Sequence, residues 1–200
     1  MDTETGGLDP AVESILTLGM VVLQDEEIVD GTLIKIVEPV INAHPRALAV
    51  NGINIDTLIT TGVGPVAAVG QVKEFLTRNG FTGSVNPAGH NVPFDVGFVK
   101  RLYSIAGVKY SRDFSYRALD TISLAAGLTL AGRLYGQREL SLDALCRRFG
   151  IQIRTGVTHD ALEDARATAK LLVKLLALIR NPSLVAPLEQ LELPLQDNAE

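Results

Sequence analysis

The sequence has very little cysteine and no tryptophan, and it contains no long apolar run. Cys146 is the only cysteine in 200 residues, so the chain cannot form an internal disulfide. A chain without disulfides suits a reducing compartment. Charged residues interrupt every apolar run before it reaches the length of a membrane span or a signal peptide. These absences predict a cytoplasmic protein that has no membrane partner.

Basic charge is also scarce. The chain has 18 Lys and Arg residues against 23 Asp and Glu residues, which gives a net charge of −5. Proteins that bind duplex nucleic acid by charge alone need a basic surface, so this class is disfavoured. Several basic residues could form a local rim beside a nucleic-acid site, although a solvated surface is the more common role of each: Lys100, Arg101, Arg112, Arg117 and Arg133.

The order of apolar patterns predicts an α/β domain. Strands are expected near residues 1–5, 15–24, 28–37, 82–88 and 115–119, with a turn at 25–27. Helices are expected near residues 45–50, 65–79, 92–106, 141–149 and 160–179, with a further helix starting around residue 120. Three meandering strands followed by strand–helix alternation indicate a mixed five-stranded sheet flanked by helices. The domain is expected to cover residues 1–180, with a proline-containing tail at 181–200.

Four acidic residues and one histidine are the main candidates for chemistry. Asp2 and Glu4 lie in MDTETGGLDP, Asp95 in HNVPFD, and His159 and Asp164 in HDALED. Each of these residues, taken alone, is most simply a solvated acid or a turn residue. Together they offer the oxygen ligands that Mg²⁺ and Mn²⁺ prefer, so convergence on divalent cations is predicted.

Local spacing is compatible with convergence of the two N-terminal acids and Asp95. Asp2 and Glu4 are two residues apart, so in a strand both side chains point to the same face. Asn91 and Pro93 are typical of a helix start and would place Asp95 in the first turn of that helix.

The spacing of His159 and Asp164 predicts a loop–helix junction. Their separation of five residues would put them on different faces of one helix. Asp160, followed by Glu163, is a typical N-cap pair. His159 would then be the last loop residue, and Asp164 would lie one turn inside the helix.

The motifs DTETGGLD, HNVPFD and HDALEDA resemble those of the DEDDh family of 3′–5′ exonucleases, which includes the proofreading epsilon subunit of bacterial DNA polymerase III and ribonuclease T. The resemblance covers roughly residues 1–178. Two further stretches agree with it, EPVINAHPRALAVNGI and SLDALCRRFGI. The resemblance implies a ribonuclease-H-like fold and release of nucleoside 5′-monophosphates from 3′ ends.

The resemblance also implies a role for each candidate residue. Asp2 would bridge two Mg²⁺ or Mn²⁺ ions. Glu4 and Asp164 would complete the ligands of the first ion, and Asp95 would hold the second. His159 would act as the general base. Two such ions stabilise the attacking and leaving oxygens of a phosphoryl displacement.

Further residues of the motifs are expected to contact the substrate. Leu8 and Val50 stand where ribonuclease-T-like members have aromatic side chains that stack on terminal bases. These aliphatic residues favour single-stranded or frayed DNA 3′ ends over RNA. Trimming of RNA 3′ ends, or a catalytically silent binding module, remain the alternatives. The other expected substrate-binding residues are Thr3, Thr5, Asn51, Asn91 and Phe94.

The sequence departs from the family at its first strand. In this fold the strand that carries the first two acids is normally central, and several apolar residues precede the first acid. Here only Met1 precedes Asp2. Either the natural start lies upstream or the strand is unusually short. A short central strand would leave backbone groups of its neighbours partly unpaired.

The tail contains a second, weaker resemblance. The segment QLELPL resembles the short motif by which bacterial replication proteins bind the sliding clamp. Its glutamine would make the polar contacts and its leucines would fill an apolar groove. The alternative is that the leucines of the tail pack onto the domain. The residues of this candidate partner motif are Gln190, Leu191, Leu193 and Leu195.

Overall fold

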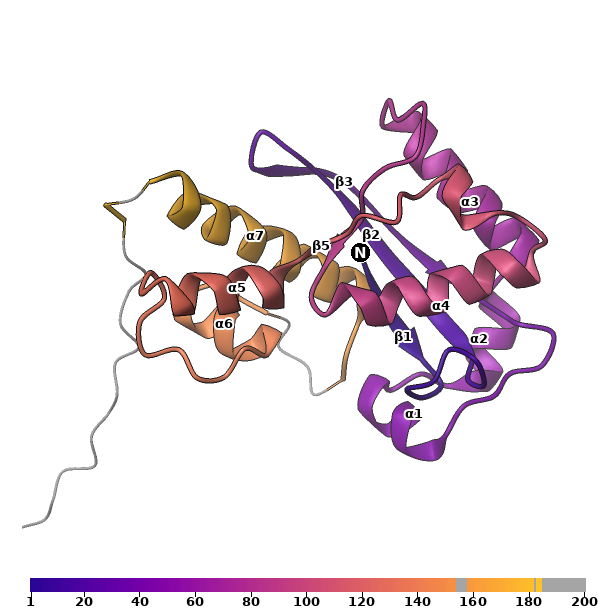
Figure 1. Ribbon diagram of the computed structural model, residues 1–200. Helices are drawn as coiled ribbons and strands as arrows, with labels where there is room; N and C mark the ends of the chain where they lie inside the picture. The colour runs from indigo at the N-terminus through magenta and orange to yellow at the C-terminus, as the bar shows by residue number, and fades with distance from the viewer. Residues whose placement is uncertain (154–157, 182, 185–200) are drawn as a thin grey trace, which may run out of the picture.

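The computed structural model describes residues 1–153, 158–181 and 183–184, and it shows a central layer of strands with helices on both sides (Figure 1). The main sheet is antiparallel, has the order β1-β2-β3, and comprises β1 (Asp2–Thr5), β2 (Ile15–Gln24) and β3 (Glu27–Lys35). Asp25 and Glu26 have φ angles of 50° and 70°, which suit the two-residue turn between β2 and β3. The predicted tail motif, from Gln190 to Leu195, lies outside the described residues.

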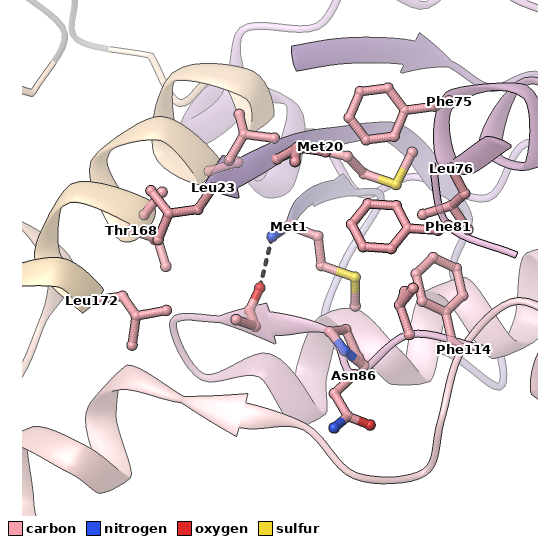
Figure 2. Close-up of a pocket in the computed structure, with 17 residues that line it drawn as sticks. Met1, Met20, Leu23, Phe75, Leu76, Phe81, Asn86, Phe114, Thr168 and Leu172 are labelled. Carbon is pink, nitrogen blue, oxygen red and sulfur yellow. Dashed lines mark hydrogen bonds between the residues drawn. The ribbon is translucent and has the colours of Figure 1, made fainter. Parts of the chain in front are cut away.

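The structure does not show the predicted single sheet of five strands. Strands β4 (Ala88–Gly89) and β5 (Leu119–Asp120) form a separate two-stranded parallel sheet. The Met1 amino group donates a hydrogen bond to the Ala88 carbonyl oxygen at 2.7 Å (Figure 2). Among the described residues, β1 pairs with β2 and forms no ladder with β4. In place of the predicted strands at 82–88 and 115–119, the structure has these two-residue strands and an isolated bridge between Val85 and Phe114.

The helices surround these strands. They are α1 (Pro45–Asn51), α2 (Ile55–Thr61), α3 (Pro65–Arg78), α4 (Val92–Ile105), α5 (Thr121–Leu130), α6 (Leu142–Arg148) and α7 (Ala161–Arg180), with a 3₁₀ turn at Tyr110–Arg112. The predicted helices agree in place with these elements, but α2 was not predicted. Its sequence IDTLITT is rich in β-branched residues, which lower helix propensity. The side chain of Asn54 nevertheless caps it by accepting from Thr57 N at 2.8 Å.

Two apolar clusters fill the space on the two sides of the strands. Helices α3 and α4 cover one side of the sheet, where Phe75, Phe98 and Tyr103 are buried. Helix α7 covers the other side and is backed by α5 and α6 (Figure 1), where Leu145 and Leu171 are buried. The layers thus place the first turn of α7 against β1, which carries Asp2 and Glu4.

Gly19 allows this close approach. It is the register partner of Asp2 in β1, and it lies beneath the first residue of α7. A Cβ atom at this position would be 2.2 Å from the carbonyl oxygen of Ala161. A glycine in β2 is therefore what lets α7 begin directly beside the acids of β1.

A buried ion pair fixes α4 to the segment after β3, and its two side chains also bind the loop before β2. The Glu38 side chain is 1% exposed and accepts from Arg101 Nη2 at 2.9 Å. It also accepts from Ser14 Oγ at 3.0 Å, while Arg101 Nη1 donates to the carbonyl oxygens of Pro10 and Ala11. Arg101 thus serves the fold and takes no part in the predicted basic rim.

Substitution of Arg101 by Met should lower the free energy of unfolding by about 3 kcal/mol, because Glu38 would remain as a buried charge without its cation. Urea denaturation measures the change. Lys100→Met is the matched control, since Lys100 is exposed and only lies over the Tyr110 ring. A control loss as large as that of Arg101→Met would contradict the role of the buried pair.

Candidate active site

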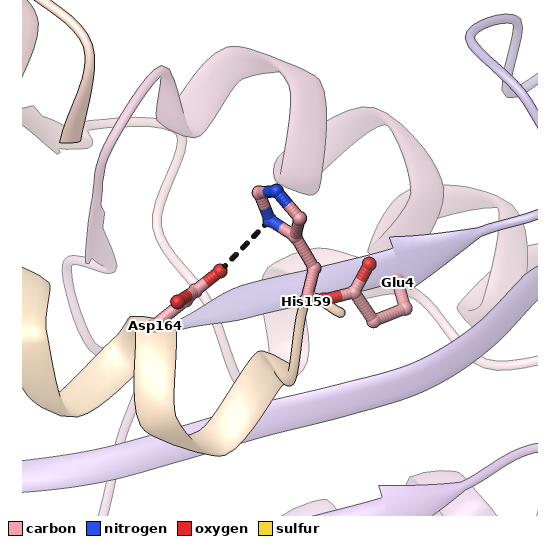
Figure 3. A group of neighbouring side chains, drawn as sticks. All are labelled: Glu4, His159 and Asp164. Carbon is pink, nitrogen blue, oxygen red and sulfur yellow. Dashed lines mark hydrogen bonds and ion pairs between the residues drawn. The ribbon is translucent and has the colours of Figure 1, made fainter. Parts of the chain in front are cut away.

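The acids of β1 and the start of α7 meet on one side of the main sheet. One side-chain ligand atom from each of Glu4, His159 and Asp164 lies within 4.8 Å of the others. The His159 Nδ1 atom is 3.2 Å from Asp164 Oδ2 (Figure 3). The Asp164 side chain is 5% exposed and that of His159 is 47% exposed. A buried carboxylate therefore faces an imidazole that is open to solvent.

The junction before α7 has the predicted form. The Asp160 side chain accepts from the backbone N–H groups of Leu162 and Glu163, each at 3.0 Å, and α7 begins at Ala161. His159 therefore precedes the cap, and Asp164 lies in the first turn. The backbone N–H of His159 also donates to the Val50 carbonyl oxygen at 3.2 Å, which ties the loop to the end of α1.

Asp95 comes from the opposite side of β1, in the first turn of α4. It is 2% exposed, and its Oδ1 atom accepts from the Thr3 hydroxyl at 2.8 Å. The Thr3 side chain therefore supports an acid of the site, and its contact with substrate stays a prediction.

The start of α4 is held by a residue that the sequence did not indicate for this role. Asp120 Oδ1 accepts from the backbone N–H groups of Asn91 at 2.8 Å and Val92 at 3.3 Å. Its second oxygen caps α5 by accepting from Ser123 N at 3.0 Å. One carboxylate thus fixes the starts of two helices, and Asn91 belongs to this cap.

Asp2 and Asp95 are linked to the cluster of Glu4, His159 and Asp164 by interactions between their charges. Among the described residues, neither joins a set of ligand atoms within 4.8 Å. The pKa of Asp2 is nevertheless raised well above its usual value, first by burial and then by the charges of Asp95, Asp164 and Glu4. Burial raises the pKa of Asp95 to about 6. Burial of both acids, and the neighbouring carboxylate charges at Asp2, are conditions that a bound cation relieves.

The raised pKa of Asp95 has a consequence for stability. Its unfolded-state pKa is about 3.9, and the folded-state value is about 6. The folded state thus binds the proton more tightly, so ionising Asp95 should destabilise the cation-free fold as pH rises from about 4 to about 6. A divalent cation bound to these acids would offset this loss of stability. The carboxylate oxygens of the four acids are the donor atoms that such a cation prefers.

A groove of about 990 Å³ opens beside β1. All the predicted substrate-binding residues except Asn91 line it, namely Thr3, Thr5, Leu8, Val50, Asn51 and Phe94. Leu8 is 83% exposed and Val50 is 51% exposed. Asn51 instead donates to the Thr5 carbonyl oxygen at 3.1 Å and anchors α1 to β1. The groove therefore presents Leu8, Val50 and Phe94 as its apolar contacts.

Two polar residues of this groove were missed from the sequence. Glu13 Oε1 lies 3.0 Å from His44 Nε2, and Glu13 Oε2 accepts from Asp9 N at 2.6 Å. This pair holds the loop that carries Leu8. Glu13 and His44 are far apart in the chain, and the stretch EPVINAHPRALAVNGI, which contains His44, does not include Glu13, so only the tertiary structure brings them together.

The predicted basic rim does not assemble around the site. Arg112 pairs with Asp113 at 3.0 Å, and Arg117 lies over the Tyr116 ring. Arg133 donates to the Leu178 carbonyl oxygen at 2.8 Å.

In the described part of the chain, no helix is both long and apolar enough to span a membrane.

Sequence comparisons extend over nearly the whole described domain. A family model described as exonuclease (RNase T) matches residues 1–172. A PolC-type DNA polymerase III from Thermotoga petrophila is 30% identical over 184 residues, which cover 90% of this chain but 12% of that protein. Ribonuclease T from Shewanella frigidimarina is 27% identical over 180 residues, which cover 86% of this chain and 78% of that protein.

Solved structures show the same fold. Exonuclease I of E. coli in complex with a dT13 oligonucleotide has a TM-score of 0.69 and 18% identity, covering 90% of this chain and 40% of that chain. Exonuclease X in complex with 5′ overhanging duplex DNA has a TM-score of 0.58 and 20% identity, covering 88% of this chain and 89% of that chain. These likenesses confirm the predicted ribonuclease-H-like α/β fold.

Proposed function

This chain belongs to the RNase T family of exonucleases, and we propose that it releases nucleoside 5′-monophosphates from single-stranded or frayed 3′ ends of DNA. The observation that carries this proposal is the convergence of Glu4, His159 and Asp164 beside a groove with exposed apolar side chains. A segment similar to this chain makes up 12% of a PolC-type DNA polymerase III, so in that relative it is part of a much larger polymerase. This likeness supports a further part of the proposal, namely that this chain associates with a polymerase in proofreading or repair.

We propose that Asp2, Glu4, Asp95 and Asp164 hold two Mg²⁺ or Mn²⁺ ions. The raised pKa values of Asp2 and Asp95 support this assignment, because burial disfavours the charged form of both acids, the neighbouring carboxylates add to this at Asp2, and a bound cation would offset both effects. When bound, such ions stabilise the charge that develops on the attacking and leaving oxygens of the phosphodiester. The chain itself holds the acids in place through the Asp160 cap of α7 and the Thr3–Asp95 hydrogen bond.

His159 is the proposed general base, which takes a proton from the attacking water. Its ring is open to solvent and its Nδ1 atom faces Asp164, so the other ring nitrogen is available for proton transfer. His159→Ala should reduce the rate of nucleotide release by about 10²–10⁴-fold. Binding of Mn²⁺ should remain close to that of the unmodified chain. Single-turnover kinetics together with Mn²⁺ titration separate the two effects, and loss of metal binding would refute this division of roles.

The apolar side chains of the groove are the proposed contacts to the terminal nucleotides. Leu8 and Val50 protrude and could wedge between bases, while the Phe94 ring lines the same groove and could stack on a base. The aliphatic wedges favour DNA as the substrate. The similarity to ribonuclease T, which extends over most of that protein, supports trimming of RNA 3′ ends as the second candidate function.

Matched DNA and RNA oligonucleotides decide between these substrates. Both carry a 5′ label and the same base sequence, and the reaction contains Mg²⁺ or Mn²⁺. We expect a ladder of products shortened from the 3′ end, with DNA degraded faster than RNA. Faster degradation of RNA would favour the ribonuclease function over the deoxyribonuclease function. If neither oligonucleotide were shortened, the alternative of a catalytically silent binding module would be favoured.

Two further proposals concern partners and location. We propose that Gln190, Leu191, Leu193 and Leu195 bind a bacterial sliding clamp, which would raise the local concentration of the enzyme at primer ends. Titration of clamp with the full chain and with Gln190→Ala/Leu193→Ala tests this. Equal binding by both chains, or none by the full chain, would remove it. The cytoplasmic location stays a prediction, which the buried free thiol of Cys146 suits.

A further inference from the structure

The carboxyl end of α1 contacts both β1 and the segment that carries His159. The buried side chain of Asn51 donates to the Thr5 carbonyl oxygen at 3.1 Å. One residue earlier, the Val50 carbonyl oxygen accepts from the backbone N–H of His159 at 3.2 Å. The side chain of the same Val50 lines the groove. One short stretch of backbone therefore joins β1, the groove and the proposed general base.

Gly52, which follows α1 directly, lies against the segment before α7. Its φ angle is 68°, in the left-handed region that favours glycine at the end of a helix. A Cβ atom at Gly52 would be 2.6 Å from Thr158 Cγ2 and 3.0 Å from Thr158 Cβ. Rotation of the Thr158 side chain would move Cγ2 but leave Cβ in place, so the backbone of Thr158 would have to shift. The missing side chain of Gly52 is therefore what lets the residue before His159 lie against α1.

The ring of His159 depends on this backbone contact for its position. The His159 side chain is 47% exposed, and its Nδ1 atom faces Asp164 Oδ2 at 3.2 Å (Figure 3). A half-exposed ring has little packing to hold it, so its placement follows the backbone that carries it. The hydrogen bond from the His159 N–H to Val50 supplies that hold.

We propose that Gly52 is a positioning residue for His159, and that residues 50–52 set the place of the general base relative to the terminal nucleotide in the groove. The inference rests on the proposed function, in which His159 takes the proton of the attacking water. Displacement of a reacting group by about 1 Å costs much of the rate of a chemical step. The four acids lie on β1, α4 and α7, away from this contact. Loss of the contact should therefore slow the chemical step and leave the binding of metal ion and DNA largely intact.

Gly52→Ala in the full chain tests the proposal, with Gly107→Ala as the matched control. Gly107 follows α4 with a φ angle of 69°, but a Cβ atom there would meet nothing within 4 Å. Gly52→Ala should lower kcat for nucleotide release from single-stranded DNA by about ten- to a hundredfold. The KM for DNA and the Kd for Mn²⁺ should change by less than about twofold. Gly107→Ala should retain its kcat, and equal losses in the two variants, or a loss confined to KM, would overturn the proposal.

A second substitution shows whether the contact with Thr158 is the cause. Thr158→Gly removes both atoms that the new Cβ atom would meet. Gly52→Ala/Thr158→Gly should therefore have a kcat close to that of Thr158→Gly alone. A loss of the same size with and without the Thr158 side chain would overturn the proposal. If Gly52→Ala does not fold, Gly52→Asn and Gly107→Asn take the place of the two alanine variants, because asparagine tolerates the left-handed conformation and still carries a Cβ atom.

Amide hydrogen exchange without DNA separates this inference from the proposed function. The His159 amide should exchange about tenfold faster in Gly52→Ala than in the unsubstituted chain, because its hydrogen bond to Val50 would be lost. Gly107→Ala should leave this exchange unchanged. Unchanged exchange in Gly52→Ala would overturn the positioning role even if the chain is an active nuclease. Absence of nucleotide release from the unsubstituted chain would instead refute the proposed function.

Discussion

Replacing Asp164 with Asn should lower the rate of 3′-nucleotide release by about a thousandfold or more. A neutral amide among the carboxylates of Asp2, Glu4 and Asp95 would bind a divalent cation poorly. The Asp164 carboxylate is buried and lies within reach of Glu4 and His159. The substitution should also stabilise the chain in the presence of a chelator, since Asp164 is one of the charges that raise the pKa of Asp2. Activity assays and thermal unfolding in EDTA measure the two effects.

Glu163→Gln is the matched control for Asp164→Asn. It makes the same chemical change one residue earlier, on a partly exposed side chain that pairs with Arg166. The control should retain nearly full activity and should not gain stability in EDTA. Similar activities for the two variants would mean that Asp164 has no special role in the chemistry.

Gly19→Ala should destabilise the chain by about 3 kcal/mol and reduce activity about a hundredfold. The new Cβ atom would be 2.2 Å from the Ala161 carbonyl oxygen, and a backbone atom at the start of α7 cannot move aside as a flexible side chain can. The first turn of α7 would have to shift, and Asp164 would shift with it. Thermal unfolding and a nuclease assay on the same preparation measure the two losses.

Gly31→Ala tests whether any alanine in this sheet has the same effect. Gly31 lies in β3, opposite Val21, and a Cβ atom there would meet its nearest neighbours at 3.4 Å, an ordinary contact distance. This variant should lose little stability and keep its activity. If Gly19→Ala lost no more stability and activity than Gly31→Ala, the close packing of α7 on β2 would not determine the position of Asp164 in the site.

The sequence was most informative where chemistry or periodicity is local. The Asp160 cap, the helix start at Asn91 and the placement of Asp164 one turn into α7 could be predicted, because each depends on a few neighbouring residues. Family motifs then identified acids that lie far apart in the chain. Their roles as metal ligands stay predictions.

The features that could not be predicted depend on tertiary contacts. Helix α2 has a β-branched sequence that local propensity disfavours, and Asn54 caps it. The pairing of Glu13 with His44 joins segments with no common motif. The prediction of a single five-stranded sheet was wrong. The continuity of such a sheet depends on how many residues pair between β1 and β4, and the apolar patterns of the strands did not determine that number.

The most direct test of the central claim is thermal unfolding with and without Mn²⁺, for the full chain and for Asp2→Asn/Asp164→Asn. Binding of Mn²⁺ to the acid group should raise the melting temperature of the full chain by about 5 °C relative to EDTA. The double variant should show no such rise. No rise in the full chain, or an equal rise in both chains, would contradict a cation site formed by these acids.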